Sequence, residues 1–282
     1  MSRIAIVTDS LASLPEELIN QYDIKVAPQV LVWGDESYLD GVDITPHEFY
    51  VRLQSSKEMP TTSQATLASF KEIFETLVPE GRPIVAIVGS SKLTATINSA
   101  EQAKSLFPDA TIEVIDSLDV AMSMGFQVLA AARAVEAGKS FEEVVSLARG
   151  AHKHTGVMFV VDTLEFLHRG GRIGGAKRLF GTALSLKPLL ELQEGRVEAV
   201  ENIRTKAKAF KRLLEVVEER LAGQSNVRIA GLHAAAEQDA RAVLDEAKNR
   251  CNPMETIWSE VTPVIGTHAG PGTVGLAYCT DL

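Results

Sequence analysis

Residues 83–96 read Pro-Ile-Val-Ala-Ile-Val-Gly-Ser-Ser-Lys-Leu-Thr-Ala-Thr. The apolar run over residues 83–88 is short and continuous, which is typical of a strand that is buried on both faces of a parallel sheet. Small and hydroxyl residues follow it, and a helix is predicted over residues 94–107. A strand, a polar loop and a helix in this order indicate an α/β fold, in which ligands bind where the strands end.

The same unit is repeated on both sides of this stretch. Polar, small residues follow two further predicted strands, as Thr8-Asp9-Ser10 and Asp116-Ser117. Residues 26–33 are expected to be extended, with a turn or hairpin at 34–37, and a short helix begins at Thr45-Pro46. Buried strands are predicted at residues 3–8 and 111–115, and helices at residues 14–22, 66–77, 119–137 and 141–155.

The pattern changes after Gly156. Strands are predicted at 157–161, 196–200, 227–233, 256–261 and 274–279, with helices near 174–184, 204–222 and 237–250. Glu194-Gly195 is a turn dipeptide that predicts a hairpin over residues 192–200. We therefore predict two domains: a three-layer α/β domain with a mainly parallel sheet over residues 1–155, and a two-layer α+β domain with a mixed sheet over residues 156–282.

Composition limits the class of protein. The 282 residues are 45% hydrophobic with a mean hydropathy of +0.06, which predicts a globular chain with an ample core. The net charge of −9 arises entirely before residue 156, where 12 Lys and Arg stand against 21 Asp and Glu. An acidic chain without a basic run is not expected to bind nucleic acid. Its apolar runs are too short for a signal peptide or a membrane span, and its two cysteines build no disulfide framework, so a cytoplasmic location is expected.

Familiar catalytic motifs are missing from the sequence. It contains no G-x-G-x-x-G after a strand, no phosphate-binding G-x-x-x-x-G-K-[ST] loop and no G-x-S-x-G elbow. The six histidines are scattered, and His152 and His154 are two positions apart, so they cannot share a metal from one helix face. We expect no catalytic residue, no cofactor and no metal.

Four segments are rich in hydroxyl groups or glycine: residues 8–10, 60–64, 90–96 and 266–273. Each alone is accounted for by helix capping, and residues 60–64 are typical of the start of a helix from Ala65. Together they supply neutral hydrogen-bond donors, with no strong base or nucleophile. Such groups suit the recognition of an anion without chemistry on it, which favours a binding protein.

These segments, together with Leu14-Pro15, Asp116-Ser117 and residues 163–174, resemble the ordered motifs of the DegV family over residues 7–273. The resemblance implies a fatty-acid carrier whose N-terminal domain holds the carboxylate and whose C-terminal domain encloses the acyl chain. It assigns the carboxylate to Thr62 and Thr94. The sequence has Thr94-Ala95 where Ser-Gly is commoner in the family, and the added methyl groups crowd this edge of the site. The other residues expected to contact the ligand are Ser63, Ser91, Ala95 and, as a supporting donor, His268.

The resemblance also implies a partner. The carrier, expected to be a monomer, presents a long-chain fatty acid to a fatty-acid kinase that forms the acyl phosphate, so the ATP site belongs to the kinase. Between Glu165 and Glu191 the chain has basic but no acidic residues, and Arg169 and Arg172 are predicted to engage the kinase. The alternative is that Gly170-Gly171-Arg172 is a turn whose arginine pairs with a carboxylate of its own domain.

Two other functions stay open on the sequence. A small-molecule hydrolase or transferase could use Asp9, Asp116 and His268 around the rim of the sheet, although Asp9 and Asp116 equally suit helix capping after strands. A regulatory or scaffold module without a ligand is the third possibility. The length and saturation of an acyl chain cannot be derived, because two methylenes change the binding free energy by only about 1.6 kcal/mol.

Overall fold

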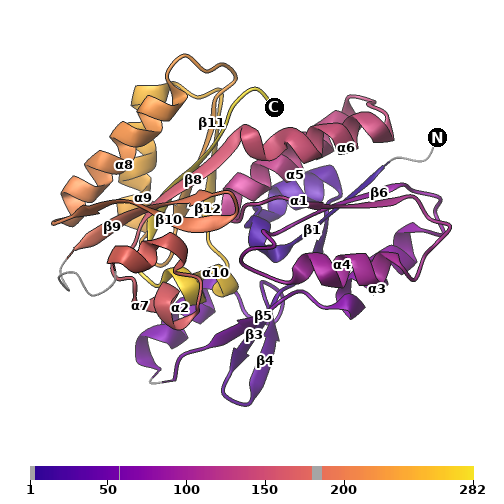
Figure 1. Cartoon of the computed structure of the whole chain (residues 1–282), viewed down its shortest axis with the longest axis horizontal. Coiled ribbons are helices and arrows are strands. Elements are labelled where there is room, and N and C mark those ends of the chain that lie inside the picture. Colours follow the sequence, from indigo (N-terminus) through magenta and orange to yellow (C-terminus); the bar gives the residue numbers. More distant parts are fainter. Residues whose placement is uncertain (1–3, 57, 180–185) are drawn as a thin grey trace.

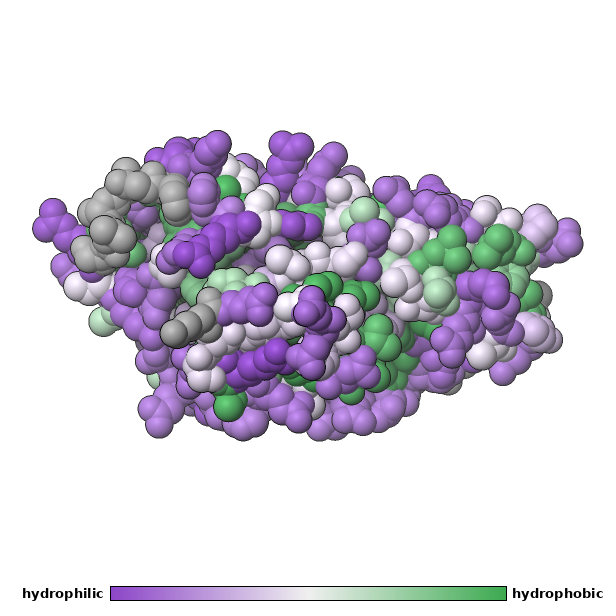
Figure 2. Space-filling view, turned by 90° about the horizontal axis from the view of Figure 1, so that it is seen from below, coloured by the Kyte–Doolittle hydropathy of each residue, from purple (hydrophilic) through white to green (hydrophobic). Residues whose placement is uncertain are grey.

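The computed structural model describes residues 4–56, 58–179 and 186–282. Two sheets lie side by side, one from each half of the chain, and a smaller sheet lies below them in Figure 1. Seen from below, in Figure 2, the surface is mainly hydrophilic, with apolar residues showing toward the middle and over the N-terminal half. The predicted combination of a parallel and a mixed sheet in an α/β protein is confirmed.

The N-terminal sheet has four parallel strands in the order β2-β1-β6-β7. Alternate residues of β1 face opposite layers: Ala5 and Val7 pack toward α3 and α4, whereas Ile6 joins the core formed with α5. The sheet is therefore buried on both faces at β1 and β6, as the apolar runs of these two strands predict. Its strands are β1 (Ala5–Asp9), β2 (Lys25–Ala27), β6 (Ile84–Val88) and β7 (Ile112–Asp116), and its helices are α1 (Glu16–Tyr22), α3 (Leu67–Leu77), α4 (Thr96–Lys104), α5 (Ala121–Glu136) and α6 (Phe141–Gly150).

The C-terminal sheet has six strands in the order β10-β9-β8-β13-β11-β12. Only β11 and β12 run parallel to each other, while the other neighbours are antiparallel. Helices α8 and α9 cover one face of this sheet. The strands are β8 (Thr155–Val160), β9 (Lys187–Gln193), β10 (Arg196–Ile203), β11 (Arg228–His233), β12 (Glu255–Glu260) and β13 (Val274–Cys279), and the helices are α8 (Lys206–Leu221) and α9 (Glu237–Cys251).

A third, antiparallel sheet corrects two predictions. It consists of β4 (Glu36–Leu39), β3 (Val30–Trp33) and β5 (Thr61–Ser63), in that order. Residues 26–33 are therefore not one strand, because the chain leaves the parallel sheet after Ala27 and enters the small sheet at Val30. Residues 60–64 do not begin a helix: β5 pairs with β3, and helix α3 starts later, with Thr66 as its cap.

Three short helices lie in connections between strands of the same sheet: α2 in the small sheet, and α7 and α10 in the mixed sheet. Helix α2 (Pro46–Ser55) begins as predicted, and Thr45 and Glu48 cap it reciprocally. Helices α7 (Glu165–Arg169) and α10 (Pro263–Ala269) were not predicted, because each is shorter than two turns and has no clear apolar period. Of the predicted helix at 174–184, residues Gly174–Leu179 form a 3₁₀ helix, η3, and the remainder lies outside the described residues.

Helix α5 packs between the two large sheets. Its apolar residues share one core with β1 and β6 of the first sheet and with β8 and β13 of the second. Thirteen of its sixteen residues are buried, which agrees with its mainly apolar sequence. The strands of the parallel sheet all precede residue 155, and those of the mixed sheet begin at that residue, with β8. The boundary between residues 155 and 156 stays a prediction.

Candidate functional site

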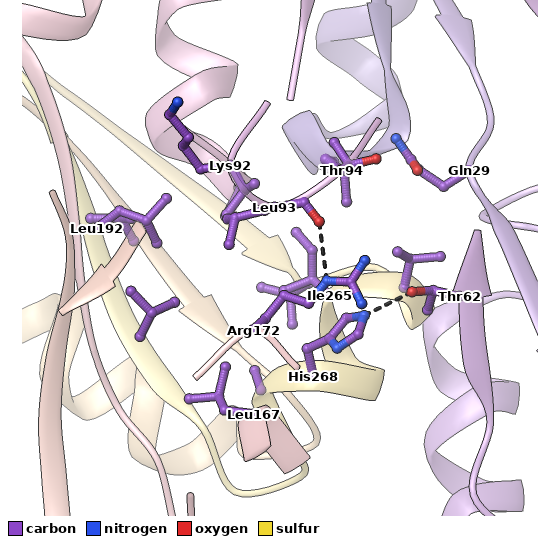
Figure 3. Close-up of a pocket in the computed structure, with 18 of the residues that line it drawn as sticks. Gln29, Thr62, Lys92, Leu93, Thr94, Leu167, Arg172, Leu192, Ile265 and His268 are labelled. Carbon is purple, nitrogen blue, oxygen red and sulfur yellow. Dashed lines mark hydrogen bonds between the residues drawn. The ribbon is translucent and has the colours of Figure 1, made fainter. Parts of the chain in front are cut away.

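A cavity of about 610 Å³ lies where the three sheets meet. Its wall combines the loop after β6, strand β5 and helix α10 with the inner face of the mixed sheet and the segment after α7. Figure 3 shows that its two sides differ: Thr62, Thr94 and Gln29 lie on one side, and Leu167 and Leu192 on the other, with His268 between them and Lys92 at the outer edge above Leu192. The cavity is therefore amphipathic, with a polar and an apolar end.

The first polar contact joins the small sheet to helix α10. The Thr62 hydroxyl lies 2.8 Å from Nε2 of His268. Burial, reinforced by the positive charge of Arg172, lowers the pKa of His268 to about 4, so its imidazole is neutral at pH 7. Because Nδ1 of His268 is buried without a hydrogen-bond partner, the proton is best placed on Nε2, from which it is donated to Thr62. The Thr62 hydroxyl is then available to donate to a ligand.

The second polar contact lies in the loop after β6. The Thr94 hydroxyl is 2.9 Å from that of Thr96, which also accepts a hydrogen bond from the side-chain amide of Gln29 at 2.8 Å. Thr94 is partly buried and Thr96 is fully buried. The loop itself is anchored by Asp116, which accepts a hydrogen bond from the backbone N–H of Ser91 at 3.2 Å.

Arg172 lies beside this pair of contacts. Its Nε donates to the carbonyl of Leu93 at 3.1 Å, and a terminal nitrogen donates to the carbonyl of Gly170 at 2.7 Å. Figure 3 places the guanidinium between Leu93 and His268. The tight turn before it requires glycine at both positions. Gly171 has a φ of +70°, which L side chains rarely adopt, and a side chain at Gly170 would collide with His268. Arg172 thus brings a fixed positive charge to the polar end of the cavity.

The other end of the cavity is apolar. Side chains from the inner face of the mixed sheet and from helix α10 form it, and the hairpin of β9 and β10 contributes Leu192 and Val197. The Glu194-Gly195 turn of this hairpin is confirmed, with φ angles of +47° and +79°. The carbonyl of Gly195 accepts a hydrogen bond from Ser90 at 2.9 Å, so the hairpin is attached to the polar loop. The remaining apolar lining includes Val157, Phe159, Leu167, Leu232, Val261 and Ile265.

The structure brings the predicted ligand contacts together. Thr62, Ser63, Ser91, Thr94, Ala95 and His268 all line the cavity, although they come from segments up to 206 positions apart in sequence. Arg172, predicted at a docking surface, lines it too, and its partners are backbone carbonyls. Arg169 is exposed and forms an ion pair with Glu165.

Asp9 and Asp116 do not join His268 at the cavity. Asp9 is fully buried and accepts hydrogen bonds from the backbone N–H groups of Leu11 and Gly89, at 2.9 and 2.7 Å. Asp116 accepts from the backbone of Ser91 and Leu118. Asp9 caps the short 3₁₀ helix Ser10–Ala12, which is the role that the sequence also allowed, whereas Asp116 ties the loop after β6 to the loop after β7.

Sequence reasoning missed Gln29 and the apolar lining. Gln29 interrupts an otherwise apolar extended segment, Val26 to Trp33, and this isolation was the available signal. The apolar residues named above come from strands β8, β9, β10 and β11, from helices α7 and α10 and from the loop after β12, so no local pattern could identify them. Among the described residues, no group of three or more His, Cys, Asp or Glu is placed to hold a metal, and no helix is long and apolar enough to cross a membrane.

Comparisons with known proteins agree with this arrangement. The family model described as "uncharacterised protein, DegV family" matches residues 3–281. A DegV domain-containing protein of Streptomyces coelicolor is 39% identical over 279 residues, covering 98% of each chain. A solved DegV family protein from Thermus thermophilus, described by its fatty acid binding, superposes with a TM-score of 0.93 at 34% identity, covering 99% of this chain and 100% of its own.

A second solved structure is DegV of Bacillus subtilis, described as a fatty acid binding protein, with a TM-score of 0.90 at 30% identity and complete coverage of both chains. A stearic acid-binding protein from Eubacterium ventriosum has a TM-score of 0.92 at 26% identity, covering 98% of each chain. The resemblance drawn from the ordered motifs is thus confirmed over the whole chain. The chain belongs to the DegV family.

Proposed function

We propose that this protein binds a long-chain fatty acid, with the carboxylate at the polar end of the cavity and the acyl chain along its apolar end. The observation that carries the proposal is the segregation of the lining: Thr62 and Thr94 face the same space as Leu167 and Leu192, from opposite sides. The volume of about 610 Å³ lies within the range of roughly 300 to 1,000 Å³ found for pockets that bury small ligands.

The acyl chain supplies most of the affinity. Each buried methylene contributes about 0.8 kcal/mol, so a chain of roughly 14 methylenes contributes on the order of 11 kcal/mol before the cost of ordering it. The polar end then needs only a few charge-assisted hydrogen bonds to fix the orientation of the ligand. The Thr62 and Thr94 hydroxyls donate these bonds, and the nearby Arg172 guanidinium offsets the negative charge.

The site is suited to holding the carboxylate without reacting with it. A histidine with a pKa of about 4 is a weak base, and the two carboxylates considered for catalysis lie at the ends of strands β1 and β7 rather than in the cavity lining. We therefore propose a carrier that presents its fatty acid to a kinase, which would form the acyl phosphate. This part of the proposal is supported by the lack of a nucleotide-binding motif in the sequence.

Native mass spectrometry of protein purified from a bacterial host tests the binding proposal. We expect one long-chain fatty acid per chain, identified by its mass after denaturation. A delipidated sample should take up added palmitate or oleate, and a Thr62→Val, Thr94→Val double variant should retain less of either. Unliganded protein that refuses both fatty acids would overturn the proposal.

A further inference from the structure

Gln29 is a polar residue at a junction between sheets. It lies between β2 and β3, where the chain passes from the parallel sheet to the small antiparallel one, and it is only 1% exposed. Its backbone is fixed at both ends: its N–H donates to the hydroxyl of Ser10 at 3.1 Å, and its carbonyl accepts from the N–H of Asp40 at 2.9 Å. Its side chain reaches the wall of the cavity.

The orientation of the Gln29 amide follows from its partners. The backbone N–H of Ala65 lies 3.1 Å from one end of the amide, and since an N–H can only donate, that end is the oxygen Oε1. The nitrogen Nε2 therefore faces the Thr96 hydroxyl, 2.8 Å away. The amide also donates to the buried carboxylate of Asp9. Every part of this buried group is satisfied in one orientation only.

This orientation sets the direction of the next hydrogen bond. The Thr96 hydroxyl accepts from Gln29, is fully buried, and needs an acceptor for its own proton. Among the described residues, the Thr94 hydroxyl, 2.9 Å away, is the acceptor within reach. The backbone N–H of Thr96 also points to the Thr94 oxygen, at 3.3 Å. With both lone pairs of Thr94 occupied, its own proton is free to point into the cavity.

We propose that Gln29 is a positioning residue, which through Thr96 makes the Thr94 hydroxyl a donor toward the cavity and so favours ligands that can only accept. This inference rests on the proposed binding of a fatty acid. An ionised carboxylate has four acceptor sites and no proton, whereas an alcohol both donates and accepts. The same amide holds Ala65, three positions after Thr62, so it also fixes the distance between the two ligand-binding hydroxyls.

Competitive displacement of a fluorescent fatty acid, with palmitate and 1-hexadecanol as competitors, tests this role. Hexadecanol adapts to either direction of the Thr94 hydroxyl, so it reports the fit of the acyl chain. In Gln29→Leu and in Thr96→Val we expect palmitate to bind roughly five- to thirtyfold more weakly, the loss typical of one or two buried hydrogen bonds. The affinity for hexadecanol should stay within about twofold, because the apolar lining is unchanged.

Two further variants separate positioning from a general loss of stability. Thr96→Ser keeps the hydroxyl, so its preference for palmitate over hexadecanol should match that of the wild type rather than that of Thr96→Val. Gln127→Leu removes another fully buried amide, which donates to Ser117 and Thr155 away from the cavity, and should lower the melting temperature without changing the ratio of the two affinities.

Wild-type protein that binds neither competitor would contradict the proposed function itself. Wild-type protein that prefers palmitate, with the same preference in Gln29→Leu and Thr96→Val, would contradict the role of Gln29 alone. A ratio that falls equally in Gln127→Leu would show that the effect is structural, and would also overturn the inference.

Discussion

The two hydroxyls that face the cavity are the simplest residues to test. Thr62→Val and Thr94→Val each remove a donor while nearly preserving shape, so each should cost roughly 1 to 3 kcal/mol of fatty-acid binding. Thr61→Val is the matched control, because Thr61 lies in the same strand but does not line the cavity. Isothermal titration with palmitate measures the three affinities. Equal affinity in both cavity variants and the control would show that the head group binds elsewhere.

A buried carboxyl near the start of α5 makes stability depend on pH. Burial raises the pKa of Asp119 to about 7, although the hydrogen bonds from Ser123 and the backbone of Val120 oppose the shift. The unfolded chain loses this proton near pH 4, so the folded state binds more protons between pH 4 and 7, and Asp119 lowers stability as the pH rises through that range. Asp119→Asn mimics the neutral form and should remove this contribution.

Urea unfolding of the wild type and of Asp119→Asn, each at pH 5 and pH 8, measures how the free energy of unfolding depends on pH. We expect the variant to gain stability relative to wild type on going to pH 8, by roughly 1 to 4 kcal/mol, which corresponds to a shift of one to three pKa units. A difference between the two proteins that does not change with pH would contradict the assignment.

Whether the position of a single site residue could be predicted from the sequence depended on the motif around it. Thr62, Thr94 and His268 were identified from motifs that resemble a family, and all three line the cavity. Arg172 was predicted at a docking surface, because the sequence shows that the side chain is charged but not whether it points outward or into the protein. Only the folded chain shows that its guanidinium turns inward to Leu93.

At the scale of the element, the β9–β10 hairpin is the part whose attachment can be tested. Gly195 has a φ of +79°, and an added Cβ would lie 2.4 Å from the hydroxyl of Ser90. Gly195→Ala should therefore destabilise the protein by about 1 kcal/mol for the backbone, plus the cost of displacing the hairpin from the loop. Because Leu192 and Val197 of this hairpin line the cavity, fatty-acid retention should also fall.

Gly138→Ala provides the control for this change. Gly138 has a φ of +77°, but nothing lies within 4 Å of an added Cβ, so only the backbone cost applies. Thermal unfolding and palmitate retention of the two variants are compared. If Gly195→Ala is no worse than Gly138→Ala in both measurements, the contact with Ser90 contributes nothing to the cavity.

Elements with a strong local signal could be predicted from the sequence, whereas those defined by distant partners could not. Strand β6 is a continuous apolar run, β1 begins with one, and β7 is apolar apart from Glu113 and its final Asp116. Helices α8 and α9 have long amphipathic patterns, so the prediction of these elements needed no tertiary information. Strand β5 has only three residues, all with hydroxyls, and its extended form is fixed by pairing with β3. Hydroxyl residues are equally common in caps, which is why the segment was predicted to start a helix.

At the scale of the whole molecule, the proposed docking of a kinase is a separate question from lipid binding. Arg169 is exposed and paired only at the surface with Glu165, so Arg169→Glu should leave lipid retention intact and lower kinase-dependent acyl-phosphate formation. Arg172→Glu should affect both, because it places a negative charge beside the carboxylate site. Phosphorylation rates are measured at low salt with the cognate kinase. Wild-type rates in Arg169→Glu would remove this residue from the docking surface.

The arrangement of the three sheets around one amphipathic cavity is the basis of the whole account, and a crystal structure of the palmitate complex tests it most directly. We predict one palmitate per chain, its carboxylate within hydrogen-bonding distance of the Thr62 and Thr94 hydroxyls, and its alkyl chain running toward Leu167 and Leu192. A ligand in the reverse orientation, or one bound outside this cavity, would contradict the account.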